Sequence, residues 1–185
     1  RDQGFDHAVK QLVEQGTPDV AFTRTQLAKL PSIKVRIVFG EAFHYILTEG
    51  LSAAPLLAAF KRAQTFYFTG KDPTVHVPKL LLEMGTKSNW FICLDWQSFD
   101  ASVQMWEIEH AFACIEQLLI FPTPLSKRAF ELSRETFKIR KLASPDGALY
   151  MRYSGIPSGS YFTNIIGSVI NYNRIEYICR KMQLE

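Results

Sequence analysis

Hydrophobic side chains recur every three or four residues in several parts of the chain, and this period predicts amphipathic helices. The clearest repeat begins at Met105 and continues to Leu119. Pro122 and Pro124 follow it and predict where that helix ends, because proline cannot continue a helix. Similar repeats predict further helices over residues 5–13, 52–63, 126–142 and from about 160 to 177.

Three shorter segments have the composition of β-strands. Residues 34–40 (KVRIVFG) alternate basic and β-branched side chains, and residues 148–153 follow a Pro-Asp-Gly turn sequence. Residues 88–94 (SNWFICL) are apolar and too short for a helix, so they predict a buried strand that ends at Asp95. Residues 17–33 contain two prolines and predict a loop. Together these elements predict an α+β fold.

Composition restricts the class of protein. A chain of 185 residues, 47% of them hydrophobic, has the size of about one domain. The longest apolar run, from Ala53 to Phe60, is much shorter than the roughly 18 residues of a membrane span, so we expect no integral membrane protein. Three cysteines without a CxxC pattern argue against a disulfide scaffold or a zinc ribbon and favour a reducing compartment.

The net charge is only +3, but the cations gather in two clusters that could neutralise phosphate groups. The first cluster covers the strand at 34–40 and the segment before it: Arg24, Lys29, Lys34 and Arg36. The second lies in the helix predicted over 126–142: Lys127, Arg128, Arg134, Lys138, Arg140 and Lys141. A solvent-exposed helix face explains the second cluster as well as a phosphate site does.

Two segments carry residue types suited to metal or phosphate chemistry. Asp95 and Asp100 are carboxylates on either side of a predicted turn and would suit Mg²⁺, although chance and helix capping also explain such a pair. Residues 153–163 (YSGIPSGSYFT) place small residues on a strand-to-helix turn, where backbone amides can approach an anion or a sugar. The alternative is that these glycines serve only the turn itself.

The order of these segments resembles one family. DWQSFDAS (95–102) resembles motif A of viral RNA-dependent RNA polymerases, and SGIPSGSYFTNIIGSVINY (154–172) resembles motif B. KVRIVFG (34–40) resembles the end of motif F. The segments are most similar to those of partitivirus polymerases, and the resemblance extends over about residues 30–180.

This resemblance implies a right-hand polymerase fold in two parts. Residues 1–87 would form a fingers segment with motif F, and residues 88–185 a partial RRM-like palm with motifs A and B. Motif C, a Gly-Asp-Asp hairpin that supplies further metal-binding carboxylates, is absent from the sequence. We therefore expect a fragment of a longer polymerase that is inactive by itself, and a chain that begins with Arg1 rather than Met agrees with this expectation.

The resemblance also implies a chemistry for motif A. Asp95 would be the catalytic carboxylate and would bind Mg²⁺ (or Mn²⁺), with the carbonyl oxygen of Trp96 as a further metal ligand. Asp100 would read the ribose 2′-hydroxyl, because deoxyribose would leave this carboxylate without a partner. The reaction would be attack of a primer 3′-oxygen on the α-phosphate of an NTP by a two-metal mechanism.

Five further residues match positions that bind the nucleotide in this family. Lys34 and Arg36 of motif F would screen the triphosphate, and Ser158, Gly159 and Thr163 of motif B would hold the ribose and the template. The implied partners are the RNA template, the nascent strand and NTPs, with viral capsid protein as a further one and no membrane. The implied location is the host cytoplasm or the inside of the virion.

The chain departs from the family pattern within motif B. Many relatives carry asparagine four residues after the threonine, whereas this chain has Gly167, and Asn171 one turn later is the candidate replacement. Two other interpretations stay open. One is a non-catalytic viral remnant in a host genome that acts as an RNA-binding or interaction module. The other is a small phosphate-binding hydrolase that uses Asp95, for which no general base can be named.

Overall fold

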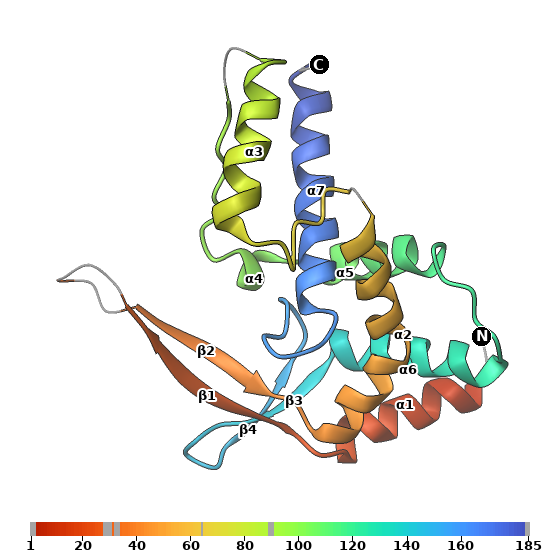
Figure 1. The fold of residues 1–185 in the computed structure, drawn as a ribbon. Helices are drawn as coiled ribbons and strands as arrows, with labels where there is room; N and C mark the ends of the chain where they lie inside the picture. Colours follow the sequence, from red (N-terminus) through yellow and green to blue (C-terminus); the bar gives the residue numbers. More distant parts are fainter. Residues whose placement is uncertain (1–2, 28–30, 32–33, 64, 89–90, 184–185) are drawn as a thin grey trace.

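The structure, a computed structural model, describes residues 3–27, 31, 34–63, 65–88 and 91–183. Its elements confirm the α+β fold (Figure 1). The helices are α1 (Gln3–Gln15), α2 (Phe43–Arg62), α3 (Pro73–Gly85), α4 (Phe99–Ser102), α5 (Met105–Glu116), α6 (Pro124–Lys138) and α7 (Thr163–Lys181). The strands are β1 (Asp19–Gln26), β2 (Lys34–Gly40), β3 (Arg140–Ala143) and β4 (Leu149–Arg152).

The four strands form one sheet in the order β2-β1-β3-β4. β1 and β2 pair antiparallel and form a ribbon that projects away from the helices (Figure 1). β1 also pairs in parallel with β3, where Asp19 lies opposite Leu142. β3 and β4 form a hairpin around the predicted Pro-Asp-Gly turn, in which Asp146 accepts a hydrogen bond of 3.1 Å from the N–H of Ala148. The sheet therefore joins the start of the chain to residues 140–152.

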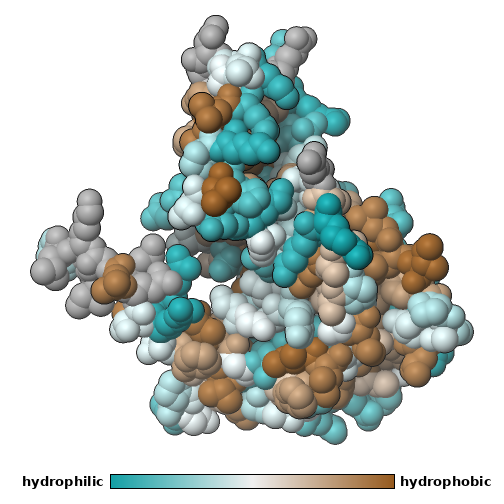
Figure 2. All heavy atoms as spheres, in the orientation of Figure 1, coloured by the Kyte–Doolittle hydropathy of each residue, from teal (hydrophilic) through white to brown (hydrophobic). Residues whose placement is uncertain are grey.

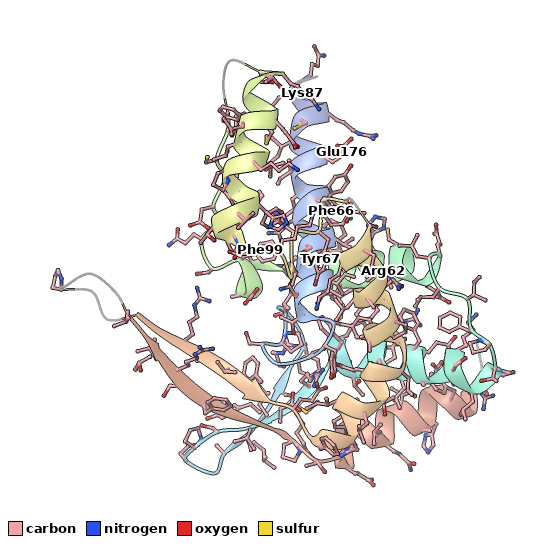
Figure 3. All side chains as sticks on the ribbon, viewed as in Figure 1. Arg62, Phe66, Tyr67, Lys87, Phe99 and Glu176 are labelled. Atoms are coloured by element: carbon pink, nitrogen blue, oxygen red, sulfur yellow. The ribbon has the colours of Figure 1, made fainter. Side chains whose placement is uncertain are left out.

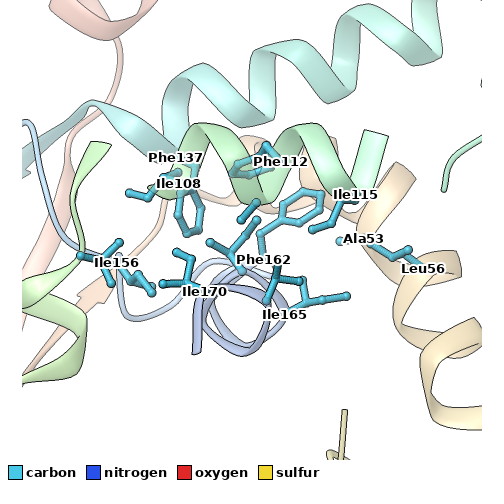
Figure 4. Close-up of a cluster of buried hydrophobic side chains, with 14 of the residues drawn as sticks. Ala53, Leu56, Ile108, Phe112, Ile115, Phe137, Ile156, Phe162, Ile165 and Ile170 are labelled. Atoms are coloured by element: carbon cyan, nitrogen blue, oxygen red, sulfur yellow. The ribbon is translucent and has the colours of Figure 1, made fainter. Parts of the chain in front are cut away.

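One hydrophobic core joins α2, α5, α6, α7 and the segment before α7 (Figure 4). Phe112 lies at its centre, with ring centroids of Phe130, Phe137 and Phe162 at 5.8, 5.3 and 5.1 Å. Each of these rings is fully buried, and burial of one such side chain stabilises the fold by about 1.5–3 kcal/mol. The core fixes the position of α7 relative to α2 and α5.

In the view of Figure 1, α3 and the C-terminal half of α7 both project above this core. The connection from α2 to α3 contacts α7. Phe66 stacks on Tyr172 with a centroid distance of 4.8 Å, and Tyr67 is buried (Figure 3). On the face shown in Figure 2, hydrophilic residues gather over the α3–α7 projection, and hydrophobic ones are more frequent over the helices below. None of the helices within the described ranges is both long enough and apolar enough to cross a membrane.

The prediction of a buried strand over residues 88–94 is wrong. Residues 91–94 have no regular secondary structure, and Phe91, Ile92 and Leu94 are exposed. Residues 89 and 90 lie outside the described residues. A buried strand needs hydrogen-bonded neighbours, and none of the four strands in the described part of the chain pairs with this segment. Asp95 is therefore not at the end of a strand.

Three other element predictions are corrected by tertiary contacts. Within residues 17–33, predicted as a loop, β1 forms because β2 and β3 supply partners on both sides. The helix predicted over 126–142 ends at Lys138, and residues 140–143 pair as β3 instead. α2 runs from Phe43 through Gly50 and Pro55, because one face of the helix is held by buried side chains such as Tyr45 and Leu56. That burial outweighs the single backbone hydrogen bond that proline removes.

Candidate functional site

Residues 95–102, here called the carboxylate turn, lie directly against residues 153–162, here called the glycine loop. The N–H groups of Ile156 and Gly155 donate to the carbonyl oxygens of Asp100 and Val103 at 2.9 and 3.0 Å. Gly155 has φ +78°, and a Cβ atom there would lie 2.9 Å from the Asp100 oxygen. Glycine is thus required for this close approach of two backbones.

The end of β2 contacts the same loop. The N–H of Phe39 donates to the carbonyl oxygen of Ser158 at 2.9 Å. Gly159 has φ +136°, and a Cβ atom there would lie only 2.2 Å from the carbonyl oxygen of Phe39. All three segments singled out by the sequence therefore meet in one place.

The start of the glycine loop is held by a half-buried arginine of β4. The guanidinium of Arg152 donates to the carbonyl oxygens of Ser154 at 2.6 Å, Gly155, and Phe137 at 3.1 Å. Partial burial, together with the positive charge of nearby Arg140, lowers the pKa of Arg152 to about 10. These contacts connect the loop to the sheet and to the end of α6.

The end of the loop is held from α7 and α2. The Thr163 hydroxyl donates to the carbonyl oxygen of Pro157. Glu49, fully buried on α2, accepts hydrogen bonds from the Ser160 hydroxyl at 2.7 Å and from the N–H of Tyr161 at 2.8 Å. Sequence reasoning singled out neither Arg152 nor Glu49. Glu49 lies 111 residues before its partner Ser160, and Arg152 lies just before the segment that resembles motif B.

The carboxylate turn is attached to α7 by a set of contacts that we call the Arg174 clamp. The Trp96 indole N–H donates to the Asn171 amide oxygen at 2.6 Å. The Arg174 guanidinium lies 5.6 Å from the ring centroid of Trp96 and 5.3 Å from that of Phe99. It also donates to both carboxylate oxygens of Glu107 at 2.7 Å. Asn171 thus connects the turn to α7, and its role as a replacement for a motif B asparagine stays a prediction.

A polar pocket of about 470 Å³ opens between the carboxylate turn and α7. This volume falls within the range of small-ligand sites. The pocket is lined by Leu94, Asp95, Trp96, Phe99, Asp100, Thr163, Asn164, Gly167, Ser168 and Asn171. Asp95 and Asp100 are both exposed there. Ser158 and Gly159 are not among the described lining residues, so the structure places them next to the pocket rather than in its wall.

Gly167, the position expected from the motif B resemblance to carry asparagine, lines the pocket. A Cβ atom there would meet Ile156 Cδ1 and Phe99 Cε1 at 3.5 Å, which is ordinary van der Waals contact. The site therefore has room for a side chain at this position, and Gly167 is not required by close packing.

Cations of the β1–β2 ribbon face this region. The Asp100 carboxyl has a raised pKa because neighbouring groups partly desolvate it, and the charge of Arg36 opposes that rise. Arg36 pairs directly across the ribbon with Arg24, and both are exposed. Like charges in such a pair repel, so an anion between them would be stabilising. Arg24 was not predicted as a site residue, because β1 was predicted as loop and the register was unknown.

The other predicted motif F cation is only partly described. Lys34 is the first residue of β2 and pairs with Gln26. Strand alternation places positions 34 and 36 on the same face of the ribbon. The side chain of Lys34 lies outside the described residues, as does Lys29.

The described residues supply only part of a metal site. Among them, no group of three or more histidine, cysteine or carboxylate side chains is placed to hold a metal ion. Asp95 offers one exposed carboxylate at the pocket, whereas a divalent magnesium ion needs a full octahedron of oxygen ligands. These residues alone do not fit a two-metal centre, and the role of the Trp96 carbonyl stays a prediction.

The second basic cluster is largely paired with carboxylates. Lys127 and Arg134 lie 3.6 and 3.5 Å from Glu116. Lys138 lies 3.0 Å from Glu109 and 2.8 Å from Glu135. This pairing favours the interpretation of α6 as an ordinary charged helix face over a phosphate-binding surface.

Comparison with known proteins identifies the relatives of this chain. The family model described as viral RNA-dependent RNA polymerase matches residues 4–184. The RNA-directed RNA polymerase of Cryptosporidium parvum virus 1 (strain KSU-1) is 28% identical over 180 residues, which cover 94% of this chain and 33% of that protein.

A solved structure shares the fold. The crystal structure of the insertion loop deletion mutant of the RNA-dependent RNA polymerase of a human picobirnavirus matches with a TM-score of 0.65 and 21% identity. The match covers 83% of this chain and 32% of that one. The chain thus spans about a third of the length of both relatives.

Proposed function

The chain belongs to the viral RNA-dependent RNA polymerase family, and we propose that it forms the nucleotide-binding part of such a polymerase. In this proposal residues 1–87 belong to the fingers and residues 88–185 to part of the palm. The observation that carries the proposal is that the glycine loop bonds to both the carboxylate turn and the end of β2, beside a pocket that the carboxylate turn and the start of α7 line. The partners would be an RNA template, the nascent strand and NTPs.

The two aspartates would have different tasks. Asp95 would bind a catalytic Mg²⁺ (or Mn²⁺). Two such ions, when bound, would stabilise the attacking and leaving oxygens of the phosphoryl transfer. Asp100 would accept a hydrogen bond from the ribose 2′-hydroxyl of the incoming nucleotide. Its raised pKa is consistent with a partly desolvated carboxyl that gains from a hydroxyl donor.

The remaining site residues would hold the triphosphate and the ribose. Arg36, with Lys34 on the same strand and Arg24 opposite, would offset phosphate charge from the ribbon side. Thr163 lines the pocket at the start of α7 and would face the ribose together with the adjacent Ser158 and Gly159. The roles of Lys34, Arg36, Ser158, Gly159 and Thr163 rest on the family position, and that of Arg24 rests on its pairing with Arg36.

Catalysis would need carboxylates beyond those in these 185 residues. Asp100 is assigned to the ribose, so Asp95 is the one pocket aspartate left to bind metal, and among the described residues a two-metal centre stays short of ligands. We therefore expect the 185-residue chain alone to be inactive in RNA synthesis. Association with capsid protein, and a site of action in the host cytoplasm or inside the virion, are further parts of the proposal.

The first testable prediction concerns Asp95. In an intact polymerase that contains this region, Asp95→Asn should lower template-directed RNA synthesis by about 100-fold or more, because the variant removes a metal-binding charge. Primer extension with labelled NTPs measures this. Asp146→Asn, in the exposed turn between β3 and β4, is the matched control and should stay within about twofold of wild type. Full activity of Asp95→Asn would refute the proposed function.

A further inference from the structure

A buried group of charges lies behind the glycine loop and has no part in the proposed chemistry. The Arg140 guanidinium is only 4% exposed and contacts three carboxylates from different elements. It lies 3.0 Å from Asp19 at the start of β1, 2.5 Å from Glu41 after β2 and 3.1 Å from Glu49 on α2. The group joins the sheet to α2.

Glu49 differs from the other two acids because it also contacts the loop. Its Oε1 atom accepts from Arg140, and its Oε2 atom accepts from the Ser160 hydroxyl and from the N–H of Tyr161. The Ser160 hydroxyl oxygen in turn accepts a hydrogen bond of 3.1 Å from the N–H of Phe162. One buried carboxylate therefore fixes three consecutive residues that follow Ser158 and Gly159.

We propose that Glu49 is a positioning residue of the nucleotide site, which holds the glycine loop so that Ser158 and Gly159 stay beside the pocket. Both oxygens of Glu49 accept from donors, which only an ionised carboxylate does without conflict. Arg140 supplies a compensating cation, which opposes the rise in the pKa of Glu49 that burial causes. The inference rests on the proposed function, since it assigns the loop's placement to nucleotide binding.

Glu49→Gln tests this with little change in shape. The amide –NH₂ of glutamine would have to face either Arg140 or the two loop donors, so one set of contacts would be lost. Glu41→Gln is the matched control, because Glu41 contacts the same arginine, whereas Glu49 is the carboxylate that accepts from Ser160 and Tyr161. Both variants perturb the charge group, but only the first removes an acceptor from Ser160 and Tyr161.

The first readout needs only the 185-residue chain. Hydrogen–deuterium exchange should become about tenfold or more faster at the amide of Tyr161, which donates to Glu49. The amide of Phe39, which donates to Ser158, should also exchange faster. In Glu41→Gln, the amides of Tyr161 and Phe39 should exchange as slowly as in wild type, after correction for any difference in global stability between the two proteins. Unchanged protection at Tyr161 in Glu49→Gln would overturn the inference.

The second readout uses an intact polymerase that contains this region. Glu49→Gln should raise KM for NTPs by about tenfold and change kcat by less than about threefold, because it displaces a binding loop and leaves Asp95 in place. Glu41→Gln should leave KM unchanged. An unchanged KM in an active Glu49→Gln enzyme would also overturn the inference. If the intact wild-type polymerase made no RNA, that result would contradict the proposed function. The hydrogen–deuterium exchange experiment would still test whether Glu49 holds the loop.

Discussion

At the scale of single residues, the glycines of the loop allow protein backbones to approach each other. The sequence suggested either that a ligand approaches these glycines or that they serve only the turn. In the structure, the carbonyl oxygen of Asp100 lies against Gly155, and that of Phe39 lies against Gly159. The glycines are therefore explained by the packing of the loop between the carboxylate turn and β2. A sequence pattern indicates the need for a small residue but not which group lies next to it.

A substitution at Gly159 tests this packing. Gly159→Ala should lower the free energy of unfolding by about 3 kcal/mol or more, because the added Cβ atom would lie 2.2 Å from the Phe39 oxygen in an unfavourable backbone conformation. Gly147→Ala is the control. Gly147 also has positive φ, +86°, but a Cβ atom there meets nothing within 4 Å, so the loss should be about 1–2 kcal/mol. Urea unfolding measures both, and equal losses would contradict the packing argument.

Single residues also show how much of the site the sequence could predict. Asp95, Asp100 and Thr163 were predicted from motif positions, and the structure brings all three to one pocket. Glu49 could not be predicted in this way, because its partners Ser160 and Tyr161 lie 111 and 112 residues further along the chain. Arg152 lies next to the loop in sequence but before the segment that resembles motif B. The proposed functions of all these residues stay predictions until they are tested.

At the scale of elements, the spacing of hydrophobic residues predicted those helices that bury one apolar face in the core. α5 was predicted from the repeat that begins at Met105, and its buried residues follow that repeat. β1 and β3 could not be predicted in the same way, because each depends on a neighbouring strand distant in sequence. Residues 91–94 show the opposite error. Their apolar, β-forming composition predicted a strand, but they pair with none of the described strands.

The Arg174 clamp is an interaction between elements and can be tested as one. Arg174→Lys should lower the free energy of unfolding by about 1–3 kcal/mol, because lysine cannot donate to both oxygens of Glu107 and stack on two rings. Arg180→Lys on the same helix is the control. Its pair with Glu176 is exposed, so the change should stay within about 0.5 kcal/mol. Similar effects of the two variants in thermal unfolding would contradict the clamp.

At the scale of the whole molecule, a single core and a single sheet join the two proposed parts of the polymerase. Ala53 and Leu56 from the first part share a core with Ile165 and Ile170 from the second. The sheet likewise joins β1 and β2 to β3 and β4. The proposed nucleotide site therefore depends on contacts between both parts, and its stability should follow that of the fold.

The buried acids should make this stability depend on pH. Burial is the main cause that raises the pKa of Glu41 from 4.5 to about 8, Arg140 opposes the rise, and the charge of Glu49 adds to it. The pKa values of Asp19 and Tyr45, in the same group, are also raised. The folded state thus keeps a proton that the unfolded state has lost, so stability is highest below the unfolded pKa and falls as pH rises towards 8.

The free energy of unfolding should fall by at most about 1.4 kcal/mol per pH unit between roughly pH 5 and 8. Glu41→Gln cannot lose this proton and should therefore show a flatter profile. Urea unfolding at several pH values in this window measures both proteins. If the stability of the wild type instead rose with pH more steeply than that of Glu41→Gln, Glu41 would not be the group that keeps a proton in the folded state.

The central claim is that the polar pocket receives a ribonucleotide, and sugar selectivity tests it most directly. The measurement is the ratio of kcat/KM for NTPs to that for dNTPs in an intact polymerase that contains this region, with Asp100 or with Asp100→Ala. We predict a strong preference for NTPs in the wild type and a loss of about 100-fold or more of that preference in the variant. An unchanged ratio in an active Asp100→Ala enzyme would show that the 2′-hydroxyl is not read at this carboxylate.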